Sequence, residues 1–467
     1  MNKPTPMKLE HYYYDIYPMV FPAGEPVEFT IKPLGEHRGF PNFKPNTKIV
    51  VQRLDSGALR DPFTAWNHTD FIVSPDEDGC LRFTYTATSE CEHYVRLYEE
   101  GEEKRFLQLP IYALDADLAT RYPLRGDLHI HTCRSDGRED PPTVCANYRK
   151  KGYDFIVVTD HHRYYPSLEA IDAYAGVKTA LNILPGEEVH LPETRVHIVN
   201  AGGLFSVNGL LEVEDNYIET NGALDKRRYN DTVTPPDIVP MEQYKAEIDA
   251  IEARITSGEE AIPANVDSRW YAVCLWAFDK IREADGLGVF AHPYWLSDMW
   301  QIPEPFTRCM LKNHPFDAFE VLGGENYYEH NGFQTALYYD EYREGRVHPI
   351  VGSTDSHGST EHNRNAAICS TIVFAPENER KAIIQAIKDR YSVAVDTIST
   401  EYRLVGEHRL QKYASFLIEN YFPIHDRQAA LDGELMFQYH HGNATKEELE
   451  LIAARAEKLL KKYIKIK

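Results

Sequence analysis

The sequence is poor in several features that mark other classes of protein. Its 467 residues include seven cysteines, an odd number without a CxxC pair, which disfavours a disulfide framework or a zinc ribbon. Proline (28) and glycine (27) stay below the fractions of disordered or collagen-like chains, and we find no internal repeat. No run is long and apolar enough to span a bilayer, and the first residues lack the apolar core of a signal peptide. We therefore expect a cytoplasmic protein.

Basic residues are scarce relative to acidic ones. The chain has 50 lysines and arginines against 72 aspartates and glutamates, which gives a formal charge of -22. This charge opposes the approach of a polyanion, so we expect neither long nucleic acid nor a membrane as a partner. A small phosphorylated substrate remains possible, because bound divalent cations can reverse the local sign of a pocket. The sequence does not indicate an oligomeric state.

The composition that is present is globular. Hydrophobic residues make up 43% of the chain and aromatic residues 12%, and the length predicts two or three domains. Up to about residue 120, short runs alternate between apolar and polar side chains, which predicts an N-terminal antiparallel β-sandwich over residues 1–120. The predicted strands are Val27 to Ile31, Lys48 to Leu54, Leu81 to Thr86, Tyr94 to Tyr98 and Phe106 to Leu109.

From about Arg125, apolar strands alternate with helical stretches, which predicts an α/β barrel or barrel-like parallel sheet over residues 121–400. The rhythm breaks over residues 204–285, which we interpret as a helical insertion with helices at Met241 to Arg254 and Arg269 to Glu283. Its stretch Asp225 to Pro240 is either a lid or a packed elaboration. Residues 401–467 are predicted to form a C-terminal helical segment, whose last helix opens on a capping box at Thr445 to Glu448.

Histidines and carboxylates gather where the apolar strands end. The strongest motif is Asp-Leu-His-Ile-His at residues 127–131, followed by Ser-Asp-Gly at 135–137. Residues two apart on a strand share a face, so His129 and His131 can present both imidazoles to one metal. One such pair is weak evidence, but four more polar motifs follow at strand ends: Thr159 to His162, Gly186 to Glu188, Ala291 to Pro293 and Thr354 to Gly358. Burying these groups is costly unless divalent cations satisfy them, so the sequence predicts a metal cluster.

In kind and order, these motifs resemble those of the PHP (polymerase and histidinol phosphatase) family of metal-dependent phosphoesterases. The resemblance spans about Gly126 to Val395 and covers neither the predicted sandwich nor the C-terminal helices. It implies a distorted (β/α)7 barrel with two or three divalent metals, usually zinc, manganese or iron, in a trinuclear site. Carried over, it assigns His129, His131, Glu188 and Asp355 to one metal, Glu188, His197 and His292 to a second, and Asp136, His161 and His357 to a third.

Two ligand assignments leave alternatives open. Glu187 adjoins Glu188, which we favour because the family pattern places the ligand two residues after the glycine. His190 competes with His197. A threonine precedes Asp355 where the family often has glycine and serine directly, so the local turn can differ.

Catalysis would use a water made acidic by the metals that share Glu188, and a positioned acid would protonate the leaving oxygen. Asp160 and His162 are candidates for that acid, and the alternative is that each only orients its neighbours. Cys133 has no evident base and is better explained as a packing residue. Candidate substrate contacts, each also explicable as surface or core, are Arg134, Arg163, Arg195, Arg364, Tyr294 and Trp295.

We therefore expect hydrolysis of a small phosphomonoester or a short oligonucleotide end. The alternatives are a metal-dependent amidohydrolase and a noncatalytic binding module of the same fold. Asp136 and His357 favour a phosphoesterase, and no lysine ends a central strand where an amidohydrolase would use one as a bridge. A decayed site would leave gaps among the ligands, and none is found. The tail pairs His425-Asp426 and His440-His441 are predicted to be structural.

Overall fold

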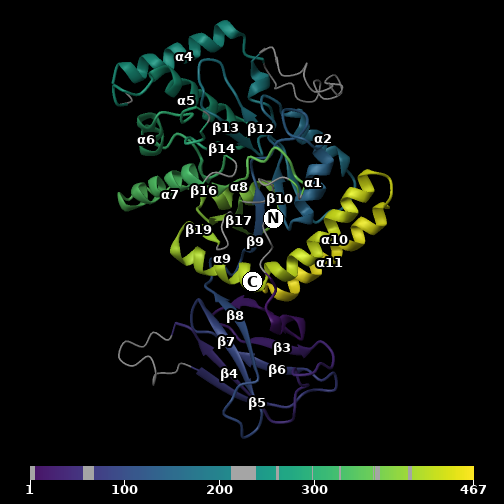
Figure 1. Cartoon of the computed structure of the whole chain (residues 1–467). Helices are drawn as coiled ribbons and strands as arrows, with labels where there is room; N and C mark the ends of the chain where they lie inside the picture. Colours follow the sequence, from purple (N-terminus) through teal and green to yellow (C-terminus); the bar gives the residue numbers. More distant parts are fainter. Residues whose placement is uncertain are drawn as a thin grey trace. The chain divides into compact units, whose positions relative to one another are not determined.

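The computed structural model describes residues 6–55, 68–211, 238–258, 262–296, 298–324, 328–360, 362, 369–397 and 402–467. The chain divides into two compact units (Figure 1). The larger unit consists mainly of Pro123–Gln411 and Ala429–Ala453, and the smaller of Lys3–Tyr122, Lys412–Gln428 and Ala454–Lys467. The C-terminal tail is thus divided between the two units.

The smaller unit contains two sheets. One has the order β1-β3-β6, with β1 (Tyr14–Tyr17), β3 (Val27–Pro33) and β6 (Leu81–Tyr85). The other has the order β2-β8-β7-β4-β5, with β2 (Val20–Pro22), β8 (Leu107–Leu114), β7 (Cys91–Tyr98), β4 (Thr47–Arg53) and β5 (His68–Val73). All five strands predicted for this region are confirmed. Aromatic rings from the two sheets pack against each other. The ring centroids are 4.8 Å apart for Phe21 and Phe29 and 5.2 Å apart for Phe71 and Phe83.

The larger unit is mixed α/β, with two sheets. The six-stranded sheet has the order β11-β10-β9-β17-β18-β19, with β9 (Tyr122–Asp127), β10 (Phe155–Val157), β11 (Asn182–Leu184), β17 (Cys369–Ala375), β18 (Ser392–Asp396) and β19 (Arg403–Val405). The five-stranded sheet runs in sequence order through β12 (Gly186–Val189), β13 (Ile198–Ala201), β14 (Leu287–Phe290), β15 (Ala318–Leu322) and β16 (Ile350–Gly352). Strand β16 contacts β17 and β18, which links the two sheets.

The expectation of a parallel sheet is correct for only part of the larger unit. Strands β9, β10 and β11 are parallel, as are β14, β15 and β16. Strands β12, β13 and β14 are antiparallel, and so are β17, β18 and β19. The segment 190–197 between β12 and β13 is too short for a parallel crossover, which needs a dozen or more residues. Adjacent apolar strands do not reveal their direction, and here the short connection decides it.

The helices follow the sequence closely. In the larger unit, α1 and α2 lie on one side of the strands and α6 and α7 on the other (Figure 1). The helices are α1 (Pro141–Lys150), α2 (Tyr165–Ala173), α4 (Met241–Thr256), α5 (Ser268–Glu283), α6 (Glu304–Asn313), α7 (Tyr328–Arg343), α8 (Arg380–Lys388), α9 (His408–Asn420), α10 (Phe422–His440) and α11 (Lys446–Tyr463). Both helices predicted for the insertion are confirmed as α4 and α5. The predicted capping box is confirmed too: the backbone N–H of Thr445 donates to Glu448, and that of Glu448 donates to the Thr445 hydroxyl.

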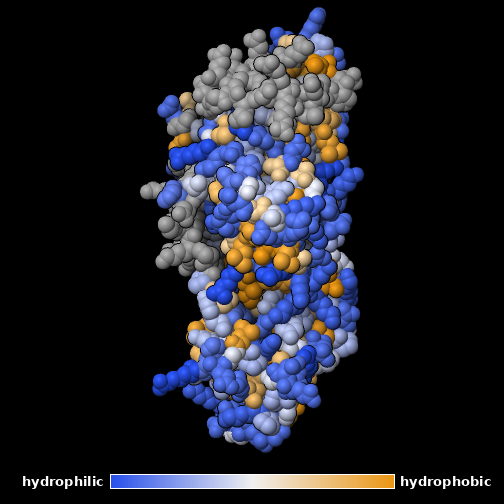
Figure 2. Space-filling model, turned by 90° about the vertical axis from the view of Figure 1, so that its right-hand side faces the viewer, coloured by the Kyte–Doolittle hydropathy of each residue, from blue (hydrophilic) through white to orange (hydrophobic). Residues whose placement is uncertain are grey.

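Two further expectations concern segments and surfaces outside the sheets. Of the stretch from Asp225 to Pro240 that is either a lid or a packed elaboration, residues 225–237 lie outside the described residues. Within the described part of the chain, no helix is both long and apolar enough to cross a membrane. The face shown in Figure 2 is largely hydrophilic, with hydrophobic residues in separate patches.

Candidate metal centre

Buried aspartates lock the loops at the strand ends to one another. Asp127, at the end of β9, accepts hydrogen bonds from the backbone N–H (3.1 Å) and the hydroxyl (2.7 Å) of Thr354, which follows β16. Asp160, beyond β10, accepts the same two bonds from Thr132, which follows β9, at 2.9 and 2.8 Å. Each aspartate therefore holds the loop that follows another strand. Buried hydrogen bonds of this kind fix the register of loops whose ligand residues are far apart in sequence.

All nine predicted metal ligands are brought together at these strand ends. Three groups have potential ligand atoms within 4.8 Å of one another: His129, His131 and Asp355; Glu188, His197 and His292; and His131, Asp136, His161 and His357. The second group equals the set that the family resemblance assigns, the third adds His131 to its set, and the first lacks Glu188, whose Oε2 lies 3.5 Å from Nε2 of both His129 and His131. The arrangement is suited to several divalent cations, and the role of each residue as a ligand stays a prediction.

Glu188 is the centre of the cluster. Its carboxylate is fully buried, with Oε1 2.7 Å from Nδ1 of His197 and Oε2 2.5 Å from Nδ1 of His161. Neither oxygen makes a hydrogen bond to any described residue. Nε2 of His129 and both ring nitrogens of His292 are also buried and have no hydrogen-bond partner among the described residues. These polar atoms therefore lie close together without satisfying one another by hydrogen bonds. Because unsatisfied buried polar atoms are costly, this donor set fits divalent cations.

The electrostatics favour the ligating protonation state of Glu188 and His131, whereas at His129 and His161 the facing carboxylates outweigh burial and raise the pKa, to about 10 for His161. Burial raises the pKa of Glu188, but the charges of His161, His197 and His129 outweigh it and hold that pKa well below its usual range. Burial, together with the neighbouring His161 and His357, lowers the pKa of His131 to about 3. An ionised carboxylate and a neutral imidazole are the forms that bind metal.

The residues of the cluster differ in exposure. The side chains of His129, His131, His292, Glu188 and Asp355 are buried. By contrast, 42% of the Asp136 side chain and 26% of the His357 side chain are exposed. His197 and His161 are exposed to 22% and 16%, so Asp136 and His357 are the most exposed of the nine predicted ligands.

The structure separates the two adjacent glutamates. Glu187 is also fully buried, but its oxygens accept hydrogen bonds from Asn200, Ser206, Asn208 and the backbone N–H of Val207. Its carboxylate is satisfied by the protein alone, unlike that of Glu188. The preference for Glu188 as the ligand agrees with this contrast.

His190 and His197 both lie in the cluster. Nε2 of His190 is 2.9 Å from Nδ1 of His161 and 3.4 Å from Oε2 of Glu188, and a further group of potential ligand atoms is formed by these three residues. The His190 and His197 rings are 4.2 Å apart. The two alternatives are therefore neighbours around the same carboxylate.

The two candidates for the general acid differ in position. Asp160 is buried and accepts three bonds from the loop that leads to Asp136, two from Thr132 and one from Ser135 at 2.6 Å. These contacts are those expected of an orienting residue, while burial raises the pKa of Asp160, so its role stays a prediction. His162 has a positive φ of 58° and its ring lies 4.4 Å from that of His190, at the edge of the cluster. His162 stays the candidate acid.

The arginines predicted to contact substrate lie in different environments. Arg134 pairs with Glu169, to which its Nε and Nη2 donate at 2.7 and 2.5 Å, and its contact to phosphate stays a prediction. Arg163 is buried beside His162, Arg195 is exposed two residues before His197, and Arg364 lies outside the described residues. Burial raises the pKa of Cys133, which agrees with a packing residue.

The two aromatic residues that follow His292, Tyr294 and Trp295, differ in burial. Tyr294 is buried and packs against Trp300 (5.2 Å) and Phe333 (5.7 Å), so it belongs to the core. Trp295 is half-buried, and its backbone N–H donates to the carbonyl of His292 at 2.9 Å. Trp295 stays a candidate substrate contact.

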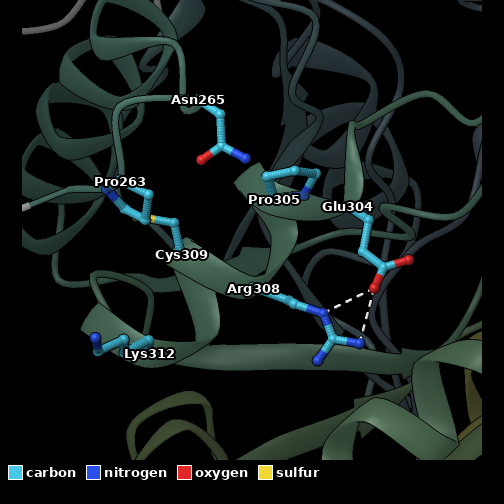
Figure 3. Close-up of a pocket in the computed structure, with 7 residues that line it drawn as sticks. All are labelled: Pro263, Asn265, Glu304, Pro305, Arg308, Cys309 and Lys312. Carbon is cyan, nitrogen blue, oxygen red and sulfur yellow. Dashed lines mark hydrogen bonds and ion pairs between the residues drawn. The ribbon is translucent and has the colours of Figure 1, made fainter.

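A surface hollow of about 430 Å³ lies away from these residues, on α6 and the segment before α5 (Figure 3). Its lining consists of Pro263, Asn265, Glu304, Pro305, Arg308, Cys309 and Lys312. Its Glu304 and Arg308 pair with each other at 2.7 Å, and burial raises the pKa of Cys309. The hollow contains none of the cluster residues.

Sequence reasoning missed one residue of the cluster. Glu320, in β15, is fully buried and accepts a hydrogen bond from Nδ1 of His129 at 3.0 Å. The available signal was a single acidic residue inside the apolar run Ala318–Leu322, directly before two glycines.

No family model matches the chain, and no curated protein matches its sequence. The chain resembles PHP-like proteins of known structure. A two-domain protein from Bacteroides vulgatus containing a predicted PHP-like metal-dependent phosphoesterase is 17% identical, with a TM-score of 0.38 over 60% of this chain and 66% of that one. A provisionally named metal-dependent phosphoesterase from Bifidobacterium adolescentis is 20% identical, with a TM-score of 0.29 over 51% and 89%.

An amidohydrolase from Chromobacterium violaceum with bound sulfate and no metal is 17% identical, with a TM-score of 0.30 over 51% of this chain and 89% of that one. This chain spans just under two thirds of the Bacteroides vulgatus protein. Likenesses with such low TM-scores carry no argument about function, so the functional case rests on the side chains of the cluster.

Proposed function

We propose that this protein is a metal-dependent hydrolase that cleaves phosphate esters in a distorted (β/α)7 barrel. The observation that carries the proposal is the carboxylate of Glu188, which lies 2.5 to 3.6 Å from nitrogens of surrounding histidines and makes no hydrogen bond to any described residue. Such a carboxylate, ringed by imidazoles, is the arrangement expected of a ligand shared between metals.

When bound, divalent ions at this site would activate a water for attack and stabilise negative charge on phosphoryl oxygens. The protein's own residues do the rest. Asp127 and Asp160 hold the strand-end loops in register, and the buried side of the cluster excludes water. His162, at the edge of the cluster, would hold the proton that passes to the leaving oxygen.

The third group favours phosphate esters over amides. The carboxylate of Asp136 lies 3.5 Å from Nε2 of His161 and 3.3 Å from Nε2 of His357. The site therefore includes a third set of potential ligands besides the two predicted metal sets that contain Glu188. A third cation there would place a further positive charge beside the most exposed residues of the cluster. A dianionic phosphate gains more from that charge than an uncharged amide does.

The substrate we propose is a small phosphomonoester or the end of a short oligonucleotide. The formal charge of -22 opposes long polyanions, and most of the cluster is buried, with Asp136 and His357 its most exposed predicted ligands. A terminal phosphate can enter such a site, whereas an internal phosphodiester brings chain on both sides.

Metal content and activity test the proposal together. Protein prepared with zinc, manganese and iron present should carry two or three transition-metal ions per chain and lose phosphatase activity in chelator. It should cleave a mononucleotide and a short 5′-phosphorylated oligomer. Absence of tightly bound metal would overturn the metal centre, and efficient cleavage of a circular single strand would overturn the substrate assignment.

A further inference from the structure

Glu320 is a buried carboxylate inside an apolar strand. All five residues of β15 are buried, and Glu320 is the only one of them with a charge. Its Oε2 accepts a hydrogen bond from Nδ1 of His129, and its Oε1 has no hydrogen-bond partner among the described residues. A carboxylate in such surroundings is costly unless a specific contact compensates it.

The contact divides the two nitrogens of His129 between two tasks. Nδ1 points to Glu320, while Nε2 lies 3.3 Å from Oδ1 of Asp355 and 3.5 Å from Oε2 of Glu188. A neutral imidazole carries one N–H and one lone pair. With the proton held on Nδ1, the lone pair of Nε2 faces the cluster.

The surrounding residues confine Glu320 to this contact. A Cβ atom at Gly323 would lie 1.7 Å from Oε1 of Glu320, so a larger residue there would displace the Glu320 side chain. On α7, Asn331 accepts from the backbone N–H of Gly323 at 2.8 Å, and Gln334 donates to the carbonyl of Glu320 at 3.2 Å. Both side chains are fully buried. Hydrogen bonds from buried side chains of α7 therefore hold the backbone at the end of β15.

We infer that Glu320 is a positioning residue for metal binding, which fixes the tautomer and the ring orientation of His129. The inference rests on the proposed function in that the cluster must bind divalent metal. Glu320, His129 and His292 also form a group of potential ligand atoms within 4.8 Å. However, Nδ1 of His129 donates its proton to Glu320, so this nitrogen has no lone pair with which to bind a metal between the two residues. Carboxylates that orient a metal-binding histidine in this way are a recurrent feature of metalloproteins.

Zinc affinity of the full chain tests the role. Glu320→Gln removes the charge with little change in shape, and we expect zinc binding, measured by competition with a chromophoric chelator, to weaken about 10- to 100-fold. The number of zinc ions per chain at saturation should not change. Glu341→Gln is the matched control, because Glu341 is also a buried carboxylate of this unit but pairs with Arg346. Its zinc affinity should equal that of the wild type.

A second variant acts on the same contact without altering the carboxylate. Gly323→Ala forces Glu320 to move, so it should weaken zinc binding in the same direction. In the cobalt-substituted wild type, NMR should show a slowly exchanging, shifted Nδ1–H signal from His129 that is lost in Glu320→Gln.

Three results would overturn parts of this picture, and they are distinguishable. Wild-type affinity in both variants would refute the positioning role. Loss of one zinc ion per chain at saturation in Glu320→Gln would show that Glu320 is a ligand instead. A wild-type protein that binds no zinc, manganese or iron would refute the proposed function itself, and this inference with it.

Discussion

Replacing Glu187 or Glu188 by glutamine should affect two different properties, the stability of the fold and the binding of metal. Glu188→Gln should abolish tight metal binding while leaving the fold intact, and Glu187→Gln should destabilise the fold while leaving the metals in place. The two changes are chemically identical, one residue apart and fully buried. They therefore control for each other.

The cost of Glu187→Gln follows from its hydrogen bonds. Asn200 donates to Oε1 and also to a backbone carbonyl, so it cannot turn round, and the backbone N–H of Val207 is likewise a fixed donor. On the Oε2 side, the Ser206 hydroxyl can rotate to accept, but Asn208 is fixed by a second bond to the carbonyl of Glu188. The new amide N–H₂ should therefore face Ser206 and leave Asn208 unsatisfied. One unsatisfied buried donor costs about 1–3 kcal/mol of unfolding free energy.

Glu188→Gln removes a negative ligand from two predicted metal sets. Loss of a residue that only orients a ligand costs about 10- to 100-fold in metal affinity, so loss of a shared ligand should cost more than about 100-fold. Elemental analysis after dialysis against a competing chelator gives the metal content, and urea unfolding gives the stability. The reasoning fails if Glu187→Gln loses as much metal as Glu188→Gln, or if Glu188→Gln keeps wild-type metal affinity.

Two further predictions concern stability. Burial lowers the pKa of His93 to about 4, so the unfolded chain binds more protons than the folded one between that pH and about 6.5, and stability is lost as pH falls through this range. Urea unfolding of His93→Phe should show a drop between pH 7 and pH 5 that is about 2 kcal/mol smaller than in the wild type, and an equal drop would contradict the shift. Asp432→Ala should destabilise the larger unit by about 3–5 kcal/mol in the same assay, because it removes the 2.7 Å partner of Arg149, whose side chain is 1% exposed. A loss below 1 kcal/mol would show that Asp154 alone satisfies the guanidinium.

Local pattern was sufficient for the elements and for the residue types of the cluster. Alternation is visible in β7, where every second side chain from Cys91 to Tyr98 is buried, and the capping box at Thr445 needs only four residues. His129 and His131 could be paired from sequence because two residues on a strand share a face. These signals are all carried by neighbours in the chain.

Contacts between distant residues could not be predicted in the same way. Arg134 pairs with Glu169 on α2, and nothing in either local sequence announces the pair. Glu320 lies 191 residues from His129, and a single acid in an apolar strand is indistinguishable from a surface position without its partner. The choice between His190 and His197 stays open for the same reason, since both follow Glu188 within a short distance. The tail pair His425 and Asp426 contact each other at 3.0 Å within α10, and their structural role stays a prediction.

The aspartate contacts also bear on the order of events during synthesis. Thr354 bonds to Asp127 across 227 residues of chain, and His131 meets Asp355 across 224. Contacts of such long range are the slow ones in folding, because a large loop must close before they contribute. A ribosome must therefore have released the chain well past His357 before the cluster can exist at all. An ion bound there would join the loop after the first strand of that unit to the loop after β16, while β17, β18 and β19 still follow in the chain.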